Sequence, residues 1–353
     1  MQQLKSGAAR YSPHLTAASQ LLQRHQANLG ARNLLFSGDL SDNFCCQLTA
    51  SKVQAYTYYY QQARRLAQNL GNPCVNFSLL PNASLVSDCD RVVYYWPKNK
   101  METQLQIYSL LAMLPLKTEW WFVGEQRCGI RQVETLLAPF GPVTLMDYAR
   151  RCRLYHFQCH HRPNFSLADY WGSYEYQGLT IKTLPAVFSR GGLDLGSQLL
   201  LEHLTGLRGR VLDLGCGAGV LGAVAQQRHP EIQLTLCDVH CHALAASQAT
   251  LNSNQLTGSV LLSDGFSELS GPFEEIVVNP PFHQGRVLTT QTTETWIQEA
   301  SNYLSPGGRL WLVANRFLPY AAILDRIFGK HQRLADNSQF VLYQATNHVK
   351  KIL

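Results

Sequence analysis

The stretch VLDLGCGAG, Val211–Gly219, decides the fold that this chain is expected to adopt. Apolar, strand-forming residues lead into three closely spaced glycines, and a helical pattern follows over Val220–Arg228. Because glycine accepts positive φ angles and lets a ligand approach the backbone, the stretch predicts a strand, a ligand-binding turn and a helix. The spacing Gly215-x-Gly217-x-Gly219 differs from the G-x-G-x-x-G of dinucleotide sites, where a helix N-terminus meets pyrophosphate. The turn therefore favours a ligand without phosphate groups.

Strand-like and helix-like segments alternate on both sides of this stretch, throughout the second half of the chain. Such alternation predicts a mostly parallel sheet, covered by helices on both faces, that binds ligands at the carboxyl ends of its strands. The tail from His331 to Asn347 predicts two further strands, and hence one antiparallel strand at the edge of the sheet. The predicted strands are Arg210–Leu214, Gln233–Asp238, Ser259–Ser263, Glu275–Asn279 and Arg309–Ala314, and the predicted helices are Val220–Arg228, Ala243–Asn252, Thr290–Leu304 and Tyr320–Phe328.

The first half of the chain resembles a fainter copy of the same plan. Three of its apolar segments match three segments of the second half in the same order: Asn33–Asp39 matches Val211–Gly217, Arg91–Lys98 matches Glu275–Phe282, and Trp120–Glu125 matches Leu310–Asn315. The first copy lacks the glycine cluster and the Asn-Pro-Pro-Phe of the second. We expect an α/β protein of two tandem Rossmann-like domains that arose by duplication, although chance similarity would give the same pattern. The expected domains are residues 1–165, degenerate, and residues 166–353, which keep the ligand-binding motifs.

Composition and length are typical of a folded protein. The 353 residues suit two domains, and 46% hydrophobic against 15% charged residues excludes a disordered chain. No apolar run is long enough to span a bilayer, and Met1–Lys5 lacks the apolar stretch of a signal peptide. We expect a cytoplasmic protein with reduced cysteines and without a membrane partner. No metal site is expected, because the spacing within Asp238–His242 is too tight for zinc.

The excess positive charge of the chain lies in its first half. Residues 1–185 hold 18 Lys and Arg against 11 Asp and Glu, a net charge of +7, and residues 186–353 hold 12 against 13, a net charge of −1. This asymmetry favours a polyanionic partner on the N-terminal half, although ordinary surface variation would also produce it. The basic residues nominated for contact with this partner are Lys98, Lys100, Arg127, Arg131, Arg150 and Arg151.

Three aspartates occupy the ends of successive predicted strands. Asp213 lies where a carboxylate can accept from the ammonium of an amino-acid ligand, Asp238 where a ribose diol would lie, and Asp264 beside the expected adenine. A helix cap or a turn explains one such aspartate, but three at successive strand ends favour a single ligand. The pattern predicts a site for S-adenosylmethionine, lined also by the turn residues Gly215, Cys216, Gly217 and Gly219.

The segment Val187–Ser197, which precedes the first strand of the second half, has the glycines and polar residues of a loop that folds over the methionine end of this cofactor. Phe188 and Asp194 are its predicted cofactor-binding residues. A domain linker followed by a helix cap explains the segment nearly as well.

Asn279-Pro280-Pro281-Phe282, after the fourth strand, predicts the reaction. A purine amine is a poor nucleophile because its lone pair is delocalised into the ring. The Asn279 side-chain oxygen and a main-chain carbonyl near Pro280 would accept both N–H bonds and aim the lone pair at the methyl group of the cofactor. The prolines would keep the turn rigid, and Phe282 would stack on a base swung out of its helix or loop. These four residues, Asn279 also contacting the cofactor, are the predicted catalytic motif; His283 lines the cleft or accepts a proton.

Together these stretches resemble the ribosomal RNA small-subunit methyltransferase C family over nearly the whole chain. The resemblance rests on Tyr94–Lys100, Val123–Glu125, Ala149–Cys152, Phe188–Ser197 and Asn279–Phe282. It implies methylation of guanine N2 in 16S ribosomal RNA, presented within the 30S subunit, with S-adenosylmethionine as cofactor. We expect the chain to act as a monomer. It also implies that the N-terminal domain recognises RNA and no longer binds cofactor, so that the six nominated basic residues contact RNA. The chain departs from the family at Gln126–Cys128 and in the loop Ser41–Cys46, both of which lie in the N-terminal half.

Three other functions fit part of the pattern. A glutamine methyltransferase acting on translation factors uses a similar Asn-Pro-Pro-aromatic motif, but predicts a small helical N-terminal domain. An adenine N6 methyltransferase stays open, because the motif alone does not choose between purine amines. A non-enzymatic RNA-binding assembly factor would be expected to lose Asp213, Gly215 or Asn279, all of which are present.

Overall fold

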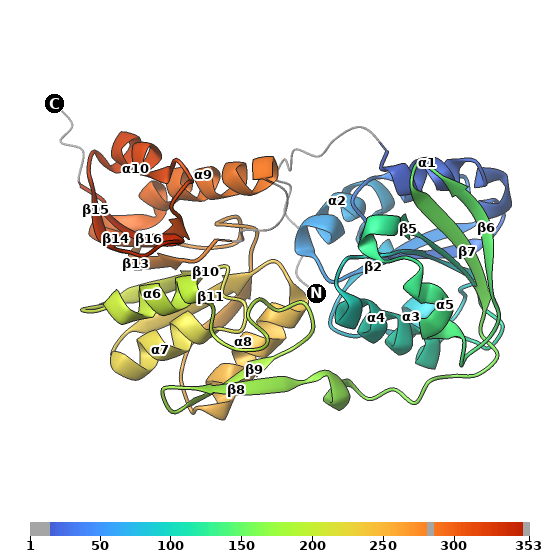
Figure 1. Ribbon diagram of the computed structural model, residues 1–353, viewed down its shortest axis with the longest axis horizontal. Helices are drawn as coiled ribbons and strands as arrows, with labels where there is room; N and C mark the ends of the chain where they lie inside the picture. The colour runs from blue at the N-terminus through green and yellow to red at the C-terminus, as the bar shows by residue number, and fades with distance from the viewer. Residues whose placement is uncertain (1–14, 281–285, 349–353) are drawn as a thin grey trace. The chain divides into compact units, whose positions relative to one another are not determined.

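The computed structural model describes residues 15–280 and 286–348, which form two compact units that divide between Tyr170 and Trp171 (Figure 1). The sequence predicts this division between residues 165 and 166. Within the described ranges, no helix has both the length and the apolar character that crossing a membrane requires.

The C-terminal unit is built on a seven-stranded sheet. Its strands are β10 (Arg210–Leu214), β11 (Gln233–Asp238), β12 (Ser259–Leu262), β13 (Phe273–Val278), β14 (Leu304–Asn315), β15 (His331–Asp336) and β16 (Phe340–Thr346). They lie in the order β12-β11-β10-β13-β14-β16-β15. The strands from β12 to β14 pair in parallel, so their carboxyl ends meet at one edge of the sheet. The glycine-rich turn lies at this edge, directly after β10.

Helices cover both faces of this sheet. They are α6 (Leu195–His203), α7 (Val220–Arg228), α8 (Cys241–Ser253), α9 (Arg286–Tyr303) and α10 (Tyr320–Phe328). In Figure 1, α9 and α10 lie on one face, and α6, α7 and α8 lie on the other. Side chains such as Ile297 of α9 and Leu324 of α10 pack with those of β10, β13 and β14 in one hydrophobic core.

The pattern predicted for this unit is confirmed, with differences at some ends and at the sheet edge. The limits of β10, β11, α7 and α10 are those predicted, whereas α9 starts at Arg286 instead of Thr290. The predicted position of the antiparallel strand is wrong. β16 pairs antiparallel with both β14 and β15 and lies inside the sheet, while β15 forms the edge. The chain goes to the edge first and then returns, and the order of strands in a sequence does not reveal this.

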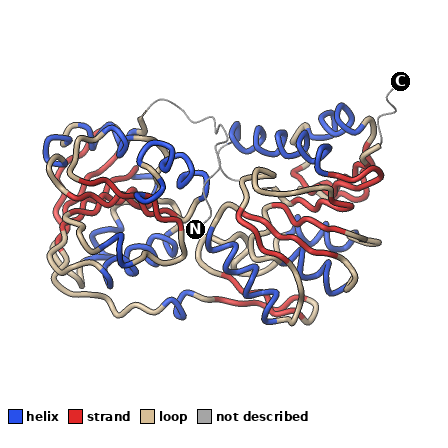
Figure 2. The backbone as a smooth tube through the Cα atoms, turned by 180° about the vertical axis from the view of Figure 1, so that it is seen from behind, coloured by secondary structure: helices blue, strands red, loops and turns tan. Residues whose placement is uncertain are grey.

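The N-terminal unit repeats the topology. Its strands are β1 (Asn33–Gly38), β2 (Lys52–Thr57), β3 (Val75–Phe77), β4 (Arg91–Tyr95), β5 (Glu119–Glu125), β6 (Val143–Ala149) and β7 (Cys152–Gln158). Their order, β3-β2-β1-β4-β5-β7-β6, equals that of the C-terminal sheet strand for strand, and Figure 2 draws both sheets in red. The helices are α1 (Ala17–Gln23), α2 (Tyr60–Leu70), α3 (Ala83–Val86), α4 (Lys100–Met113) and α5 (Gln132–Leu137), with 3-10 turns η1 (Gln26–Leu29), η2 (Phe44–Gln47), η3 (Asn72–Cys74), η4 (Gln126–Cys128) and η5 (Leu167–Tyr170). The predicted fold class, two tandem Rossmann-like domains, is confirmed.

A hairpin that the sequence analysis does not predict, β8 (Gly172–Tyr176) and β9 (Leu179–Thr183), opens the C-terminal unit. Its two turn residues, Gln177 and Gly178, have φ angles of 49° and 79°, as two-residue hairpin turns require. The backbone N of Lys182 donates to Thr250 Oγ1 at 3.0 Å, which attaches β9 to α8. The turn signal between two alternating segments could have found this hairpin.

Candidate active site

The glycine-rich turn after β10 has the conformation that its sequence predicts. Gly215, Gly217 and Gly219 have φ angles of 76°, 55° and 76°, a region that other residues rarely occupy. A methyl group at Gly219 would lie 3.0 Å from Ser247 Oγ, so this glycine lets α7 approach α8 closely. A methyl group at Gly217 would meet nothing nearer than Phe188 Cβ, at 3.9 Å. On this open side the backbone of the turn can contact a ligand.

Asp213 is buried in β10, and its two carboxylate oxygens differ. Oδ2 accepts a hydrogen bond of 2.9 Å from the backbone N of Gly222 in α7. Oδ1 has no hydrogen-bond partner among the residues that the structure describes. Burial, which the bond from Gly222 only partly offsets, raises the pKa of Asp213 to about 7, and the Asp238 carboxylate adds to the rise. A buried, unpaired carboxylate oxygen fits a positively charged ligand group such as an ammonium.

The other two predicted aspartates lie at the same edge. Asp238 accepts hydrogen bonds from the backbone N of Gly217 at 3.0 Å and from that of His240 at 2.9 Å, so it ties the glycine turn to the start of α8. Asp264 follows β12, and its backbone N donates to Ser267 Oγ at 3.3 Å. Since β10, β11 and β12 are adjacent and parallel, all three aspartates line one edge of the sheet.

Asn279 follows β13, and its amide group is held in one orientation. Nδ2 donates to Ser197 Oγ at 2.8 Å and to Asp194 Oδ1 at 3.2 Å. Because a carboxylate only accepts hydrogen bonds, the NH2 group of Asn279 must face Asp194. The carbonyl oxygen Oδ1 is buried and has no hydrogen-bond partner within residues 15–280 and 286–348. The site therefore holds a fixed acceptor that lacks a donor.

Asp194, predicted to bind the cofactor, makes several contacts within the chain. Its Oδ1 accepts from the backbone N atoms of Gly196 and Ser197, both at 3.0 Å, and caps α6. Its Oδ2 accepts from Ser189 Oγ at 3.1 Å. Asp194 and Ser197 thus hold Asn279 in place. The sequence did not single out Ser197, because 82 positions separate it from Asn279 and only folding brings the two together.

Two further predicted residues flank the glycine turn differently. Phe188 is 45% exposed beside Gly217. Cys216 is buried, and its Sγ lies 3.1 Å from Ser247 Oγ on α8. Its side chain is therefore directed toward α8, and only its backbone is available to a ligand at the turn.

The predicted catalytic motif lies only partly within the described residues. Pro280 is the last described residue before a gap, and Pro281, Phe282 and His283 lie outside the described residues. The roles predicted for them stay predictions.

The corresponding edge of the N-terminal unit differs at two decisive positions. The match between the two halves pairs Tyr95, the last residue of β4, with Asn279, and Tyr95 is buried, with its hydroxyl 2.7 Å from Ser19 Oγ. A methyl group at Gly38, the last residue of β1, would overlap the carbonyl oxygen of Tyr95. At these positions the N-terminal unit therefore has a buried phenol instead of an amide acceptor, and packed backbone instead of an open turn.

The six nominated basic residues are all exposed and lie at this carboxyl edge of the N-terminal sheet. Lys98 and Lys100 follow β4, Arg127 and Arg131 follow β5, and Arg150 and Arg151 form the β6–β7 turn, which lies beside the end of β5. Arg127 Nε is 2.5 Å from Glu125 Oε2, so part of its charge is neutralised. Arg150 and Arg151 have φ angles of 53° and 60°, which costs residues with side chains on the order of 1 kcal/mol each.

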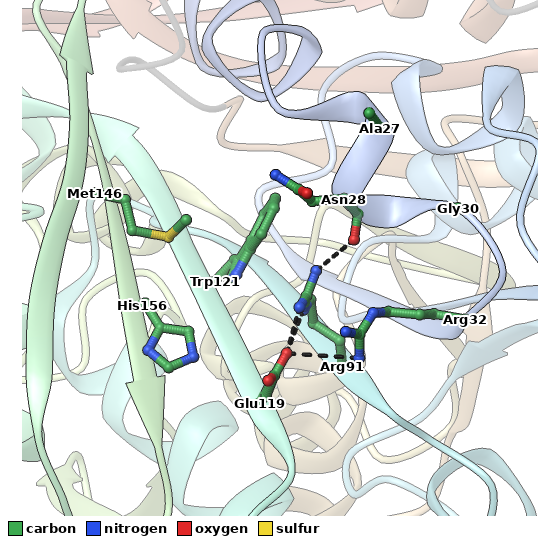
Figure 3. A pocket seen from close by; sticks show the side chains of 9 residues that line it. All are labelled: Ala27, Asn28, Gly30, Arg32, Arg91, Glu119, Trp121, Met146 and His156. Carbon is green, nitrogen blue, oxygen red and sulfur yellow. Dashed lines mark hydrogen bonds and ion pairs between the residues drawn. The ribbon is translucent and has the colours of Figure 1, made fainter.

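A cavity of about 460 Å³ lies at the opposite, amino edge of this sheet (Figure 3). Arg91 is buried there, donates to Glu119 and to the Asn28 carbonyl oxygen at 2.7 Å, and lies 4.3 Å from the centre of the Trp121 ring. Arg32 lies 3.6 Å from the same carboxylate oxygen of Glu119. None of the site residues predicted from the sequence lines this cavity.

Comparison with protein families gives the class of protein. The model "methyltransferase small domain" matches residues 178–344, and the model "methyltransferase small domain N-terminal" matches residues 19–174. The fold and the site thus define a methyltransferase with two related domains.

Individual relatives give the family. Ribosomal RNA small subunit methyltransferase C of Salmonella agona (strain SL483) and that of Salmonella typhi are each 45% identical to this chain over 339 residues, which cover 95% of this chain and 99% of theirs. The chain belongs to the ribosomal RNA small subunit methyltransferase C family, which confirms the resemblance. A solved structure, the T. thermophilus 16S rRNA N2 G1207 methyltransferase in complex with AdoMet and guanosine, is similar in fold, with a TM-score of 0.81 and 23% identity over 95% of this chain and 93% of that one.

Proposed function

We propose that this chain transfers a methyl group from S-adenosylmethionine to the N2 amino group of a guanine in 16S ribosomal RNA. The observation that carries the proposal is the Asn279 amide, whose Oδ1 is buried and unpartnered among the described residues while its Nδ2 is held by Ser197 and Asp194. The name of the T. thermophilus relative, which was solved with AdoMet and guanosine, supports this substrate and cofactor, with position 1207 as the expected target.

The residues at the carboxyl edge of the C-terminal sheet fit S-adenosylmethionine. The unpaired Asp213 Oδ1 suits the ammonium of its methionine part, Asp238 the ribose diol and Asp264 the adenine. When bound, the cofactor supplies a methyl group on a positively charged sulfur. The other residues assigned to this site are Gly215, Gly219, the backbones of Cys216 and Gly217, and the flanking Phe188, Asp194 and Asn279.

Asn279 prepares the amino group for attack. Its Oδ1 accepts one N–H of the guanine amine, and a main-chain carbonyl near Pro280 accepts the other, so the nitrogen lone pair is directed at the methyl group. The new N–C bond forms as the C–S bond breaks, and the displaced proton passes to water, so no strong base is required. Pro281 is assigned the rigidity of this turn, and Phe282 stacking on the flipped guanine.

We assign RNA recognition to the N-terminal domain, residues 1–165, and catalysis to residues 166–353. The surplus of basic residues in the first half and the gathering of six of them at one edge support this division. The proposed substrate is the RNA within the 30S particle, which a monomer of this chain would meet in the cytoplasm.

Reversing the charge of Lys98 and Lys100 together, K98E/K100E, is expected to weaken RNA binding at least about tenfold near physiological salt. Each phosphate that the variant no longer neutralises should reduce the salt dependence of binding by about one unit in a double-logarithmic plot. Filter binding of 16S RNA over a range of salt concentrations measures both. The affinity for S-adenosylmethionine should be unchanged, because both lysines lie in the N-terminal unit.

The matched control is K52E/K117E, which makes the same change of net charge at the amino edge of the same sheet, where β2 and β5 begin. If K98E/K100E binds RNA like wild type, or if both double variants are weakened equally, the nominated edge is not the RNA surface.

The modified nucleoside tests the function as a whole. Isotope-labelled S-adenosylmethionine is incubated with the protein and either naked 16S RNA or 30S subunits, and the product is digested and identified by mass spectrometry. N2-methylguanosine is the expected product. Methyladenosine would favour the adenine alternative, labelled protein the glutamine alternative, and no transfer an assembly factor.

A further inference from the structure

Two side chains on α9, Trp296 and Glu299, lie at the cofactor edge but have no role in the proposed chemistry. The indole of Trp296 lies against two glycine turns at once. A methyl group at Gly215, after β10, would lie 3.5 Å from Trp296 Cη2, and one at Gly265, after β12, would lie 2.8 Å from Trp296 Nε1. The ring therefore extends between the two turns. A side chain at position 265 would collide with it.

Trp296 differs from the core tryptophan of the same unit. Trp311 is 2% exposed, and its Nε1 donates to Glu275 Oε2 at 2.8 Å, as a buried indole requires. Trp296 packs against the hydrophobic core on one side but stays partly exposed. Part of its surface can therefore contact a ligand at the glycine turns.

Glu299 lies one turn further along α9, beside the same turn as Trp296. Its Oε2 would lie 3.6 Å from a methyl group at Gly265. Burial, and after it the negative charge of Asp264, raise the pKa of Glu299. The carboxyl groups of Glu299 and Asp264 thus repel each other near the Gly265 turn, and a ligand group that donates hydrogen bonds would stabilise their charged forms.

The chemistry of this surface matches one part of the cofactor. A purine offers a flat aromatic face, which packs well against an indole, and adenine carries an exocyclic amino group, which donates to carboxylates. The ribose and the methionine part offer no aromatic face. The turns that Trp296 touches are those assigned to this ligand, since Gly215 opens the glycine-rich turn and Gly265 follows Asp264.

We propose that Trp296 and Glu299 form the adenine-binding wall of the cofactor site. The indole packs against the purine ring, and the Glu299 carboxylate accepts a hydrogen bond from the adenine amino group. This proposal rests on the proposed function, because it presupposes a bound S-adenosyl compound.

Calorimetric binding to the full-length protein tests the indole, with S-adenosylhomocysteine, 5′-methylthioadenosine and methionine as probes. Trp296→Ala is expected to weaken both adenosine-containing probes by the same factor, about tenfold, because both pack the same purine ring against the indole. Trp296→Phe should retain most of the affinity. In addition, the change in tryptophan fluorescence on binding should vanish in Trp296→Phe and persist in the control Trp171→Phe, which changes the residue directly before β8, far in the sequence from the glycine turns.

Glu299→Gln tests the hydrogen bond. Wild type should prefer S-adenosylhomocysteine to its inosine analogue, in which an oxygen replaces the amino group, by about tenfold or more. The glutamine variant should narrow this preference, because its amide can donate to that oxygen as well as accept from an amine.

The outcomes separate the two levels of proposal. If wild type binds none of the adenosine-containing probes, the proposed function fails. If wild type binds them and Trp296→Ala binds equally well, the adenine wall is wrong and the function stands. Should Trp296→Ala not fold, the fluorescence of Trp296→Phe decides, and a persisting change on binding overturns the wall. An unchanged inosine preference in Glu299→Gln overturns the role of Glu299.

Discussion

Replacing Asn279 by alanine is expected to lower kcat for methyl transfer by about 100- to 1,000-fold, and to weaken the binding of S-adenosylmethionine by a much smaller factor. The variant loses Oδ1, the buried acceptor proposed to orient the reacting amine, and removing one such preorganised polar group costs about this much in other enzymes. Single-turnover methylation of 30S subunits, with cofactor binding measured separately by calorimetry, checks both parts.

Ser197→Ala is the matched control for this prediction. It removes the 2.8 Å hydrogen bond that holds Nδ2 but leaves the Asn279 oxygen in the site. A smaller loss of kcat, about tenfold, is expected, because the amide keeps its bond to Asp194. A near-normal kcat in Asn279→Ala at saturating cofactor would rule out the amide as the acceptor for the amine.

Asp213→Asn is expected to stabilise the cofactor-free protein at pH 8 and to weaken its binding of S-adenosylmethionine. Burial raises the pKa of Asp213 to about 7 from an ordinary value of 3.8. The folded protein therefore holds a proton that the unfolded chain has released between about pH 4 and pH 7, and the free energy of unfolding falls as the pH rises through this window. This window of about three pH units corresponds to roughly 4 kcal/mol of unfolding free energy, and above pH 7 all of this stabilisation is lost.

Asparagine keeps an oxygen that can accept from the backbone N of Gly222 but cannot ionise. Urea unfolding at pH 5 and pH 8 should show wild type losing stability with rising pH, and Asp213→Asn losing roughly 3 kcal/mol less, because about two of the three pH units of this window lie above pH 5. The half-exposed Asp264→Asn serves as control, since it removes a carboxylate from the same edge without deep burial. Equal pH dependence in wild type and Asp213→Asn would show that Asp213 ionises normally.

The same substitution, Asp213→Asn, should weaken the binding of S-adenosylmethionine although it stabilises the cofactor-free protein. If the cofactor ammonium pairs with Asp213 Oδ1, the asparagine variant should bind it about 10- to 100-fold more weakly at pH 8, as expected for loss of a charged hydrogen bond. A residue that destabilises the free protein while it strengthens binding is typical of a functional site.

The C-terminal half could be predicted from the sequence almost element by element. Val211–Gly219 combines strand formers, positive-φ glycines and a helical continuation, and each local preference agrees with the fold. In the N-terminal half, β2, β3, β6 and β7 were not located, although three other strands matched the second copy. Edge strands such as β3, with three half-buried residues, carry little hydrophobic pattern.

For the candidate site, the sequence indicates which residues come together but not the contacts that they make. Asn279 and the three aspartates stand at strand ends, and parallel pairing brings strand ends to one edge, so their grouping follows from the fold class. The contacts of Asp194 and Ser197 with Asn279, and those of Trp296 with Gly215 and Gly265, join segments far apart in the chain and leave no local signal.

The sequence by itself therefore determined the class of fold, its duplication and the edge of the sheet at which the candidate site lies, because these depend on local pattern and on the rules of parallel sheets. Only the tertiary structure decided which amide atom of Asn279 is free to accept, where Asp194 directs its carboxylate, and that the antiparallel strand lies inside the sheet. Those features depend on side-chain packing and hydrogen bonds between distant segments, and these form only once the core has closed.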